Sequence, residues 1–406
     1  MSDAIPTSVE SIRASFPILA RRVNGCPLVY CDSAATSLTP VEVLDAEAHY
    51  YRQIGGNVHR GSHALALEAS DAYEAARAQV ARFLGASSRQ LVFTANATSA
   101  LNMVASGLAL DDDAEVLACS NDHHAAILPF HKRGLLRLFD AVPHEAITPE
   151  QLARAIGPKT RAVVLTHASN VTGVVQPLRA LCRVARERNV VSIVDAAQSA
   201  PHLPLDVREL DCDFLALSGH KLLGPTGIGV LYGRDEALSR LTPRDVGGGT
   251  VTHVTRAGFS WNALPARLEP GTPNIAGAIG LAAAVRYLER VGFPWLEAHH
   301  AALREVARQK LARLPSVRVL SSSEPGALPL VSVALSDLPT TVDVIATALS
   351  DRYGVMVRSG LHCAHPLFER LELRDGALRA SFYLYNTVEE VSYFCDSLAE
   401  ILGVFA

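Results

Sequence analysis

One lysine of this sequence stands where a reactive amine would be useful. Lys221 ends the stretch Ser218-Gly219-His220-Lys221, which follows the apolar run 214–217 and leads into a Gly/Pro turn. The run predicts a strand that is buried on both faces. Open α/β sheets bind their ligands at the carboxyl ends of such strands. Burial there favours the neutral amine that a Schiff base requires. The alternative is a surface lysine that happens to precede a turn.

A second reactive side chain lies far along the chain, in the Gly/Pro-bounded loop 360–366. Cys363 stands there between His362 and His365. The thiolate is the nucleophilic form of cysteine, so a catalytic Cys363 requires a lowered pKa or a nearby base. The candidate bases are His59, His123 and His362. Two alternatives are one more buried thiol among seven and a metal site, although no further ligand set accompanies these three residues.

Polar residues recur where other predicted strands end. The apolar runs that predict these strands are 91–94, 115–119, 161–166, 190–195, 214–218 and 229–232. Short apolar strands that alternate with helices indicate βαβ units and a mainly parallel sheet. The polar residues at their carboxyl ends are Thr98, His123, Asn170, Asp195 and Ser218. In an open parallel sheet such ends converge on one crevice, so we expect one shared site.

An aldehyde cofactor such as pyridoxal phosphate matches this set of residues. Its pyridine nitrogen needs an acidic partner, which Asp195 can supply, and the alternative for Asp195 is a helix or turn cap. Its phosphate needs hydroxyls and N–H groups near a helix N-terminus, where Thr98 stands, and Ser218 and His220 flank the lysine. Gln198 can hydrogen-bond the phenolate oxygen. Together the assignments fit one ligand.

The remaining sequence predicts a second, smaller part. Glycine-rich polar loops at 247–250 and 269–274 separate it from the alternating strands and helices. Its predicted elements are helices at 276–291, 294–314, 342–353 and from 387, and strands at 317–320, 330–335, 355–359 and 378–382. We expect an N-terminal arm over residues 1–27 that packs with the small domain, a large domain over 28–270 that binds the cofactor, and a small α+β domain over 271–406 that carries the cysteine loop.

Composition limits the classes of partner. The chain has 406 residues, of which 49% are hydrophobic, and a net charge of −4 without a basic run, so nucleic acid is excluded as an expected partner. The N-terminus shows no export signal, and no apolar stretch is long enough to span a membrane. Seven scattered cysteines, an odd number, predict reduced thiols in the cytoplasm.

The chain resembles group II (SUF-type) cysteine desulfurases, in the class V aminotransferase branch of fold-type I pyridoxal-phosphate enzymes. The resemblance extends over essentially the whole sequence. The motifs that carry it are PIL (17–19), VNG (23–25), LVYCDSAA (28–35), VHRG (58–61), HASNV (167–171), VDAAQ (194–198), SGHKLLGPTGIG (218–229), EPGTPN (269–274), RSGLHCA (358–364) and RASFYLYNT (379–387). The resemblance implies a large domain with a mainly parallel seven-stranded sheet, a smaller α+β domain and a homodimer.

The resemblance also implies roles for single residues. Those for the cofactor are Lys221 as the Schiff-base lysine, Asp195 at the pyridine nitrogen, His123 stacked on the ring, Gln198 at the phenolate oxygen, Asn170 beside the cofactor, and Ala97, Thr98, Ser218 and His220 at the phosphate, with Thr272 of the second subunit. Those for the substrate are Arg379 at its carboxylate, Asn170, His59 and Arg358. Cys363 is implied as the sulfur acceptor, with Lys221 removing the Cα proton.

The implied reaction converts L-cysteine to L-alanine and leaves the sulfur on Cys363 as a persulfide. An acceptor protein then takes the sulfur for iron–sulfur clusters or other sulfur compounds. Alternatives on the same scaffold are a selenocysteine lyase, a C–S lyase, an amino-acid epimerase or a non-enzymatic scaffold. The sequence departs from the family pattern in three places: the turn 94–99, Asp122 where glutamate is usual, and a shorter segment 130–148. These departures leave both a housekeeping role and a specialised biosynthetic role open.

Overall fold

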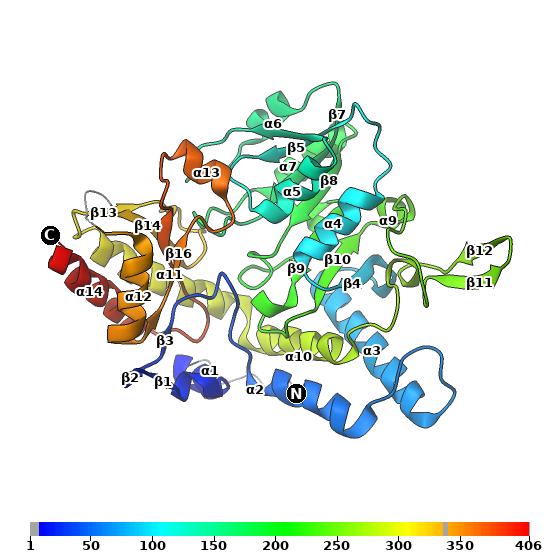
Figure 1. Cartoon of the computed structure of the whole chain (residues 1–406), viewed down its shortest axis with the longest axis horizontal. Coiled ribbons are helices and arrows are strands. Elements are labelled where there is room, and N and C mark those ends of the chain that lie inside the picture. The colour runs from blue at the N-terminus through cyan, green and yellow to red at the C-terminus, as the bar shows by residue number, and fades with distance from the viewer. Residues whose placement is uncertain (1–7, 336–339, 406) are drawn as a thin grey trace.

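A seven-stranded sheet forms the centre of the computed structural model, which describes residues 8–335 and 340–405 (Figure 1). Residues 1–7, the start of the predicted arm, lie outside the described residues. The strand order is β4-β10-β9-β8-β7-β5-β6, and within this sheet β10 alone runs antiparallel to its neighbours. The strands are β4 (Leu91–Thr94), β5 (Glu115–Cys119), β6 (Leu136–Phe139), β7 (Thr160–Thr166), β8 (Val191–Asp195), β9 (Phe214–Ser218) and β10 (Gly229–Gly233). The predicted mainly parallel seven-stranded sheet is confirmed.

Alternation along the strands builds one core on each face of this sheet. In β9, Leu215 and Leu217 belong to one core, whereas Phe214 and Ala216 belong to the other. Successive side chains of a strand point to opposite faces, so an uninterrupted apolar run needs helices on both sides. The first core includes α3 (Ala64–Phe83), α7 (Leu178–Glu187) and α10 (Ile275–Val291), and the second includes α4 (Ala97–Gly107) and α5 (His124–Lys132).

A second sheet of four antiparallel strands lies beside the first, in the order β13-β14-β17-β16. Its strands are β13 (Val317–Val319), β14 (Leu330–Leu335), β16 (Arg358–Gly360) and β17 (Ala377–Ser381), and the surrounding helices are α11 (Phe293–Leu311), α12 (Val342–Tyr353), α13 (His365–Arg370) and α14 (Val388–Phe405). Residues of α11, α12 and α14 share a separate core with β14 and β17. This arrangement matches the expected smaller α+β part.

The short strands at Arg22–Val23, Cys26–Pro27, Val251–Thr255 and Gly258–Trp261 were not predicted. Two further differences concern the two main sheets. The strand β6 was not predicted, because its residues are only partly covered and lack a continuous apolar run. The predicted strand at 355–359 is two short strands with different partners: β15 (Val355–Met356) pairs with β3 (Val29–Tyr30), whereas β16 joins the four-stranded sheet.

The helix α10 packs on α3 and on α2 (Val41–His49) and contributes to the core of the large sheet, although it follows residue 270 in the sequence. The predicted domain boundaries at residues 27 and 270 stay a prediction.

The remaining elements are α1 (Val9–Ala14), η1 (Pro17–Ala20), β1 (Arg22–Val23), β2 (Cys26–Pro27), η2 (Tyr50–Ile54), η3 (Ser88–Gln90), α6 (Pro149–Ala155), α8 (Val207–Leu210), η4 (Gly219–Lys221), α9 (Asp235–Ser239), β11 (Val251–Thr255), β12 (Gly258–Trp261) and η5 (Ala266–Leu268). Among the described helices, none has the length and apolarity needed to cross a membrane.

A buried pair of histidines predicts that acid destabilises the fold. The rings of His202 and His300 lie 5.0 Å apart, and Tyr383 packs against His202. Burial lowers the pKa of His202 to about 3 and lowers that of His300 as well. An unfolded histidine titrates near pH 6.5, so below that pH the unfolded state binds more protons and the free energy of unfolding falls by up to about 1.4 kcal/mol per pH unit for each group.

Urea unfolding at pH 7.5 and pH 5.5 measures this effect. We expect His202→Gln to reduce the difference between the two pH values by about 1.4 kcal/mol, because one such group is removed. The exposed His131→Gln is the matched control and should keep the wild-type difference. An unchanged difference in His202→Gln would show that this imidazole does not contribute.

Candidate active site

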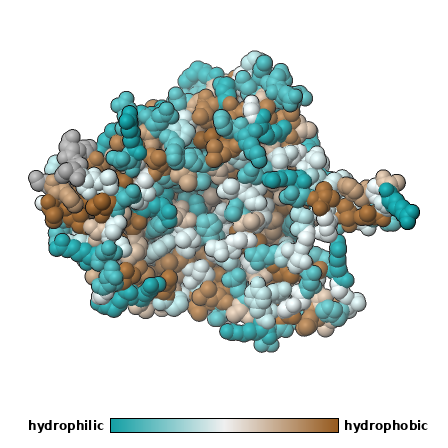
Figure 2. Space-filling model, in the orientation of Figure 1, coloured by the Kyte–Doolittle hydropathy of each residue, from teal (hydrophilic) through white to brown (hydrophobic). Residues whose placement is uncertain are grey.

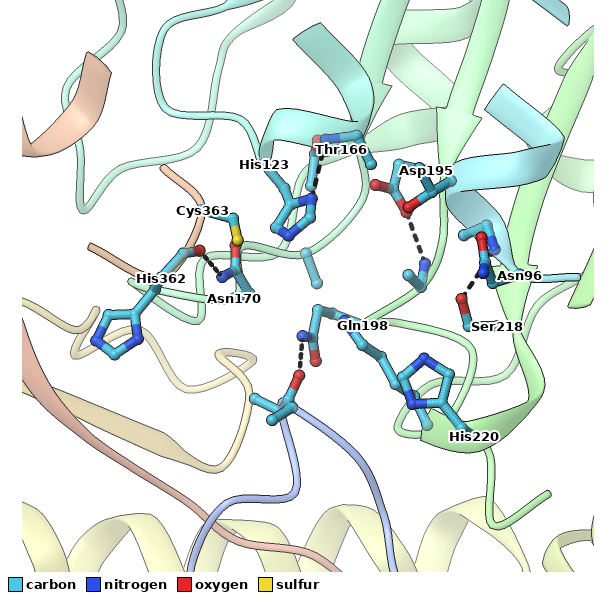
Figure 3. A pocket seen from close by; sticks show the side chains of 18 of the residues that line it. Asn96, His123, Thr166, Asn170, Asp195, Gln198, Ser218, His220, His362 and Cys363 are labelled. Atoms are coloured by element: carbon cyan, nitrogen blue, oxygen red, sulfur yellow. Dashed lines mark hydrogen bonds between the residues drawn. The ribbon is translucent and has the colours of Figure 1, made fainter. Parts of the chain in front are cut away.

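A cavity of about 480 Å³ lies at the carboxyl ends of β4, β5, β7, β8 and β9 and is closed by β16, β17 and the cysteine loop (Figure 3). All but two of the predicted site residues line it. Those that do are Ala97, Thr98, His123, Asn170, Asp195, Gln198, Ser218, His220, Lys221, Arg358, Cys363 and Arg379. The sheet therefore brings together side chains that are up to 280 or so positions apart, as convergence of strand ends requires.

The two exceptions are His59 and Thr272. His59 Nε2 lies 3.6 Å from Glu74 Oε1, in a separate surface hollow. Thr272 Oγ1 accepts a hydrogen bond from Asn57 Nδ2 at 3.4 Å. Within one chain, His59 therefore does not reach the cavity as a base for Cys363. For Thr272 the resemblance implied a role in the site of a second subunit, and that role stays a prediction.

The strand β9 delivers Lys221 through the 3-10 turn η4. The backbone carbonyl of His220 accepts hydrogen bonds from Thr36 and Ser37, which fix this turn against the N-terminal segment. Part of the Lys221 side chain faces the cavity, yet surrounding protein desolvates its amine and lowers its pKa to about 8, with Asp195 opposing the shift. A substantial fraction of the neutral, nucleophilic amine therefore exists near neutral pH.

Asp195 ends the neighbouring strand β8 and is buried. Its Oδ1 accepts a hydrogen bond from the backbone N–H of Ala197 at 2.9 Å. Burial raises its pKa, and the nearby Lys221 lowers it. A cationic partner would stabilise this buried carboxylate, and a protonated pyridine nitrogen is such a partner.

The N-terminus of α4 forms one end of the cavity. Asn96 caps the helix by accepting from the N–H of Ser99, and Ser218 Oγ accepts from the N–H of Ala97 at 2.9 Å. The turn fits tightly against β10, since a Cβ at Gly229 would lie 2.5 Å from the Cα of Asn96. The amide and hydroxyl of Thr98 complete the first turn. A helix N-terminus with hydroxyls beside it is suited to a phosphate group.

His123 and Gln198 flank the centre of the cavity. His123 caps α5, with its Nδ1 accepting from the N–H of Ala125 at 3.0 Å. Burial, followed by the positive charge of Lys221, lowers the pKa of His123 to about 4, so the ring is neutral. Gln198 donates one amide hydrogen to the carbonyl of Ala34 at 2.7 Å, and its amide has a second hydrogen to donate.

Arg379 reaches the cavity from β17 and is almost fully buried. It donates to the backbone carbonyl of Asn170 at 3.0 Å and to Asp32 at 3.2 Å. Its Nε has no hydrogen-bond partner among the described residues. A buried guanidinium with an unused donor beside a cavity is suited to bind a carboxylate.

Cys363 is the one exposed cysteine of the described chain, and it lies at the cavity beside Asn170 and His123 (Figure 3). Its carbonyl accepts from the N–H of His124 at 2.8 Å, and the carbonyl of His362 accepts from Asn170 Nδ2 at 2.8 Å. Both His362 and Cys363 have left-handed backbones, with φ of 45° and 56°. Such conformations cost of order 1 kcal/mol or more in non-glycine residues and occur where surrounding contacts hold them.

The ring of His362 does not act on the thiol. Its Nε2 lies 3.0 Å from the carbonyl oxygen of Ala377, and the ring points away from the cavity (Figure 3). Of the three candidate bases, His123 is the one whose ring the structure places in the cavity with Cys363. The described residues contain no cluster of three or more histidine, cysteine or acidic side chains that could hold a metal ion.

Two acidic residues near the site had no role predicted from the sequence. Asp32, which directly precedes the turn 33–36, accepts hydrogen bonds from both Arg358 and Arg379. Asp122 is buried at the end of β5, where it accepts from the N–H of Cys119 at 3.0 Å and burial raises its pKa to about 7. Asp32 was part of a quoted motif, but no local pattern indicates that its partners lie more than 300 residues away.

The sequence matches the family model for "Aminotransferase class-V" over residues 29–394. The chain belongs to the class-V aminotransferase family. A curated relative from Halalkalibacterium halodurans, named a probable cysteine desulfurase, is 40% identical over 98% of this chain and 99% of its own. The solved apo structure of a cysteine desulfurase from Thermococcus onnurineus NA1 superposes with a TM-score of 0.91, at 35% identity and 98% coverage of both chains.

A more distant structural neighbour is C-DES, described as a cystine C-S lyase in complex with its reaction product cysteine persulfide. It is 27% identical with a TM-score of 0.83, over 95% of this chain and 99% of its own. Another C-DES structure holds glycine covalently linked to a pyridoxal-phosphate cofactor. The predicted class V branch and fold are thus confirmed, whereas the SUF group II subtype stays a prediction.

Proposed function

We propose that this class-V aminotransferase is a pyridoxal-phosphate-dependent cysteine desulfurase that converts L-cysteine to L-alanine. One observation carries the proposal: the exposed thiol of Cys363 lines the same cavity as Lys221, Asp195 and Arg379. The lysine and the aspartate suit the cofactor, the arginine suits an amino-acid carboxylate, and the thiol suits the acceptance of sulfur. The full-length similarity to proteins named cysteine desulfurases supports the same activity.

The residues of the cavity fit the cofactor. Lys221 would hold its aldehyde carbon and Asp195 its ring nitrogen, while the first turn of α4 with Ser218 would hold its phosphate. His123 would cover one face of the ring, and the second amide hydrogen of Gln198 would reach the phenolate oxygen. When bound, pyridoxal phosphate supplies an electron sink that stabilises negative charge at the substrate Cα.

The protein's own groups account for the proton transfer. Lys221, whose pKa is lowered to about 8 mainly by burial, is the base that we assign to the Cα proton. A base with a pKa near the working pH combines availability with proton affinity. The neutral His123 lies beside it and can donate through Nε2, since its Nδ1 already accepts from Ala125.

Cys363 then takes the sulfur. Its thiolate attacks the substrate sulfur, so that an S–S bond forms as the Cβ–S bond breaks, and Cβ gains a proton to give L-alanine. Three cations, Lys221, Arg358 and Arg379, lie within electrostatic reach of Cys363. The persulfide on the exposed Cys363 is then available to an acceptor protein.

Arg379 gives a prediction about substrate binding. We expect Arg379→Gln to raise the KM for L-cysteine by about 30-fold or more, because a buried charged partner of the carboxylate is lost. Steady-state kinetics of L-alanine formation measures it. Arg318→Gln, at an exposed position on β13 of the same sheet, is the control and should keep the wild-type KM. A wild-type KM in Arg379→Gln would place the carboxylate elsewhere.

We also propose a homodimer. The hairpin β11–β12 projects from the body of the molecule (Figure 1), and apolar residues lie along it (Figure 2). Val254 and Phe259 are 65% and 50% exposed, which is costly for an isolated two-stranded hairpin in water. A second copy that covers this hairpin would also supply Thr272 to the phosphate end of the neighbouring site. Sedimentation equilibrium tests the state, and a monomer at micromolar concentration would refute it.

The decisive experiment measures L-alanine and sulfide from L-cysteine, with and without a thiol reductant or an acceptor protein, beside L-selenocysteine. Turnover of L-cysteine that rises when the acceptor protein is added supports the desulfurase. We expect the protein to be cytoplasmic, where it would meet such acceptors. The similarity to C-DES favours a C–S lyase as the second candidate. That activity would release the sulfur product without needing Cys363, and activity on selenocysteine alone would favour a selenocysteine lyase.

A further inference from the structure

Two arginines stand directly opposite each other at the edge of the cavity. Arg358 of β16 pairs in register with Arg379 of β17, and both line the cavity. Like charges directly opposite on antiparallel strands destabilise a sheet. The guanidinium of Arg379 is also almost fully buried, and a buried charge requires a partner. This strand pair therefore needs an anion between its side chains.

Asp32 is that anion. Its carboxylate accepts from Arg358 through Nε at 3.2 and 3.1 Å and through Nη2 at 2.9 Å, and from Arg379 Nη2 at 3.2 Å. The side chain of Asp32 is only 13% exposed. The contact raises the pKa of Arg358, and Asp32 opposes the effect of burial on the pKa of Arg379.

The backbone holds Asp32 in this place. Asp32 follows β3 and forms a parallel bridge with Ser381, at the end of β17. The N–H of Ser381 donates to the carbonyl of Cys31 at 2.8 Å, and the N–H of Ser33 donates to the carbonyl of Ser381. Backbone hydrogen bonds therefore fix the segment that carries Asp32 to β17, the strand that carries Arg379. The position of Asp32 is thus set by backbone hydrogen bonds and not by the side chains of the two arginines.

The charges at this end of the cavity do not balance. Two guanidinium groups face one carboxylate, which leaves a surplus of one positive charge, since Lys221 has Asp195 as its own counter-charge. The other titratable groups that interact with Arg379 or Asp32 are Lys221, Cys363, His123, His362, Tyr30 and Cys31. Burial lowers the pKa of both histidines and raises the pKa of Tyr30 and Cys31, so these four groups carry no charge. The Nε of Arg379 adds a buried donor without a partner. One monovalent anion would both balance the charge and use this donor.

We propose that Asp32 is a positioning and specificity-determining residue of the substrate site. It holds Arg379 and Arg358 in place and limits the surplus to one positive charge, so that the site selects amino acids with one carboxylate over dicarboxylic amino acids. The inference rests on the proposed function in one respect, that this cavity binds an α-amino acid. Asp32 acts through the arginines and touches no reacting atom.

The test compares the binding of L-alanine and L-aspartate to the cofactor-loaded protein, measured by titration of its visible absorbance. In wild type we expect L-aspartate to bind more weakly. Asp32→Asn keeps the shape and removes the charge, so the surplus becomes two, and the ratio of the two dissociation constants (aspartate over alanine) should fall by about tenfold. The KM for L-cysteine should rise in the same variant, with a smaller change in kcat, since the arginines lose their anchor.

Three further variants separate charge selection from a structural role. Asp32→Glu keeps the charge and should restore the wild-type ratio even if its KM is raised. Arg358→Gln removes the surplus positive charge and should raise the ratio, whereas Asp32→Asn should lower it. If Asp32→Asn does not fold, Arg358→Gln still tests the proposal. Asp113→Asn, at a site where the side chain is 74% exposed, should leave all values unchanged.

An unchanged ratio in both Asp32→Asn and Arg358→Gln would overturn the proposal. So would a ratio that falls equally in Asp32→Glu, because loss of packing would then explain the effect. The two dissociation constants are equilibrium values that do not require turnover. A wild-type protein that forms no L-alanine from L-cysteine would therefore refute the proposed reaction but leave the charge selection at Asp32 measurable.

Discussion

Replacement of Cys363 by serine should abolish the conversion of L-cysteine to L-alanine, with a loss on the order of 10³-fold or more, while the protein still binds its cofactor. A serine hydroxyl is not ionised at neutral pH and cannot replace a thiolate as the acceptor of sulfur. Cys363 forms no disulfide and is exposed, so the substitution leaves the cores intact. L-alanine formation and the absorbance of the bound cofactor are the two measurements.

Cys26→Ser is the matched control for this prediction. Cys26 is the only other cysteine of the described chain that is not buried, and its Sγ contacts the carbonyl of Arg352 at 3.3 Å, away from the cavity. We expect it to retain wild-type turnover. Full turnover of L-cysteine by Cys363→Ser would exclude the desulfurase mechanism and favour the C–S lyase. Mass spectrometry adds a direct readout, since one additional sulfur atom should appear on the peptide with Cys363 in wild type after a brief exposure to L-cysteine.

The sequence was sufficient for six of the seven strands of the large sheet, all but β6, because those six are apolar runs. The run at 214–218 predicts β9, and its place before Lys221 predicts that the lysine meets the other strand ends. The same logic assigned Asp195 and His123 to the shared cavity, where the structure has them. These predictions succeeded because the local pattern locates each strand. In a parallel sheet the carboxyl ends of the strands then lie at the same edge.

Pairings between distant segments were not predictable in the same way. The strand β6 is short and partly exposed, so it shows no hydrophobic pattern that would predict a strand. The strand β3 pairs with β15, which lies more than 300 positions away in the sequence. Asp32 is the clearest case for function, because its role depends on two arginines whose register is set by β16 and β17. Register is a property of the folded sheet and leaves no signal at residue 32 itself.

Lys221→Ala should remove both covalent attachment of the cofactor and turnover, with a loss of at least about 10² to 10⁴-fold for the proton transfer alone. Wild-type protein loaded with pyridoxal phosphate and reduced with borohydride should gain the mass of the cofactor irreversibly, and the variant should not. Lys132→Ala is the control: this exposed lysine on α5 lies near the cavity, and its removal should leave attachment and turnover unchanged.

The pH dependence of attachment tests the environment of Lys221 rather than its presence. Only the neutral amine attacks the aldehyde, and burial lowers the pKa of Lys221 to about 8. The rate of attachment to cofactor-free protein should therefore rise about tenfold per pH unit below pH 8 and level off above it. An amine in free solvent would instead give a rate that climbs toward pH 10, about the ordinary lysine value. A plateau that appears only near pH 10 would show that η4 leaves the amine hydrated, and Lys221 would then be a poor base for the Cα proton at neutral pH.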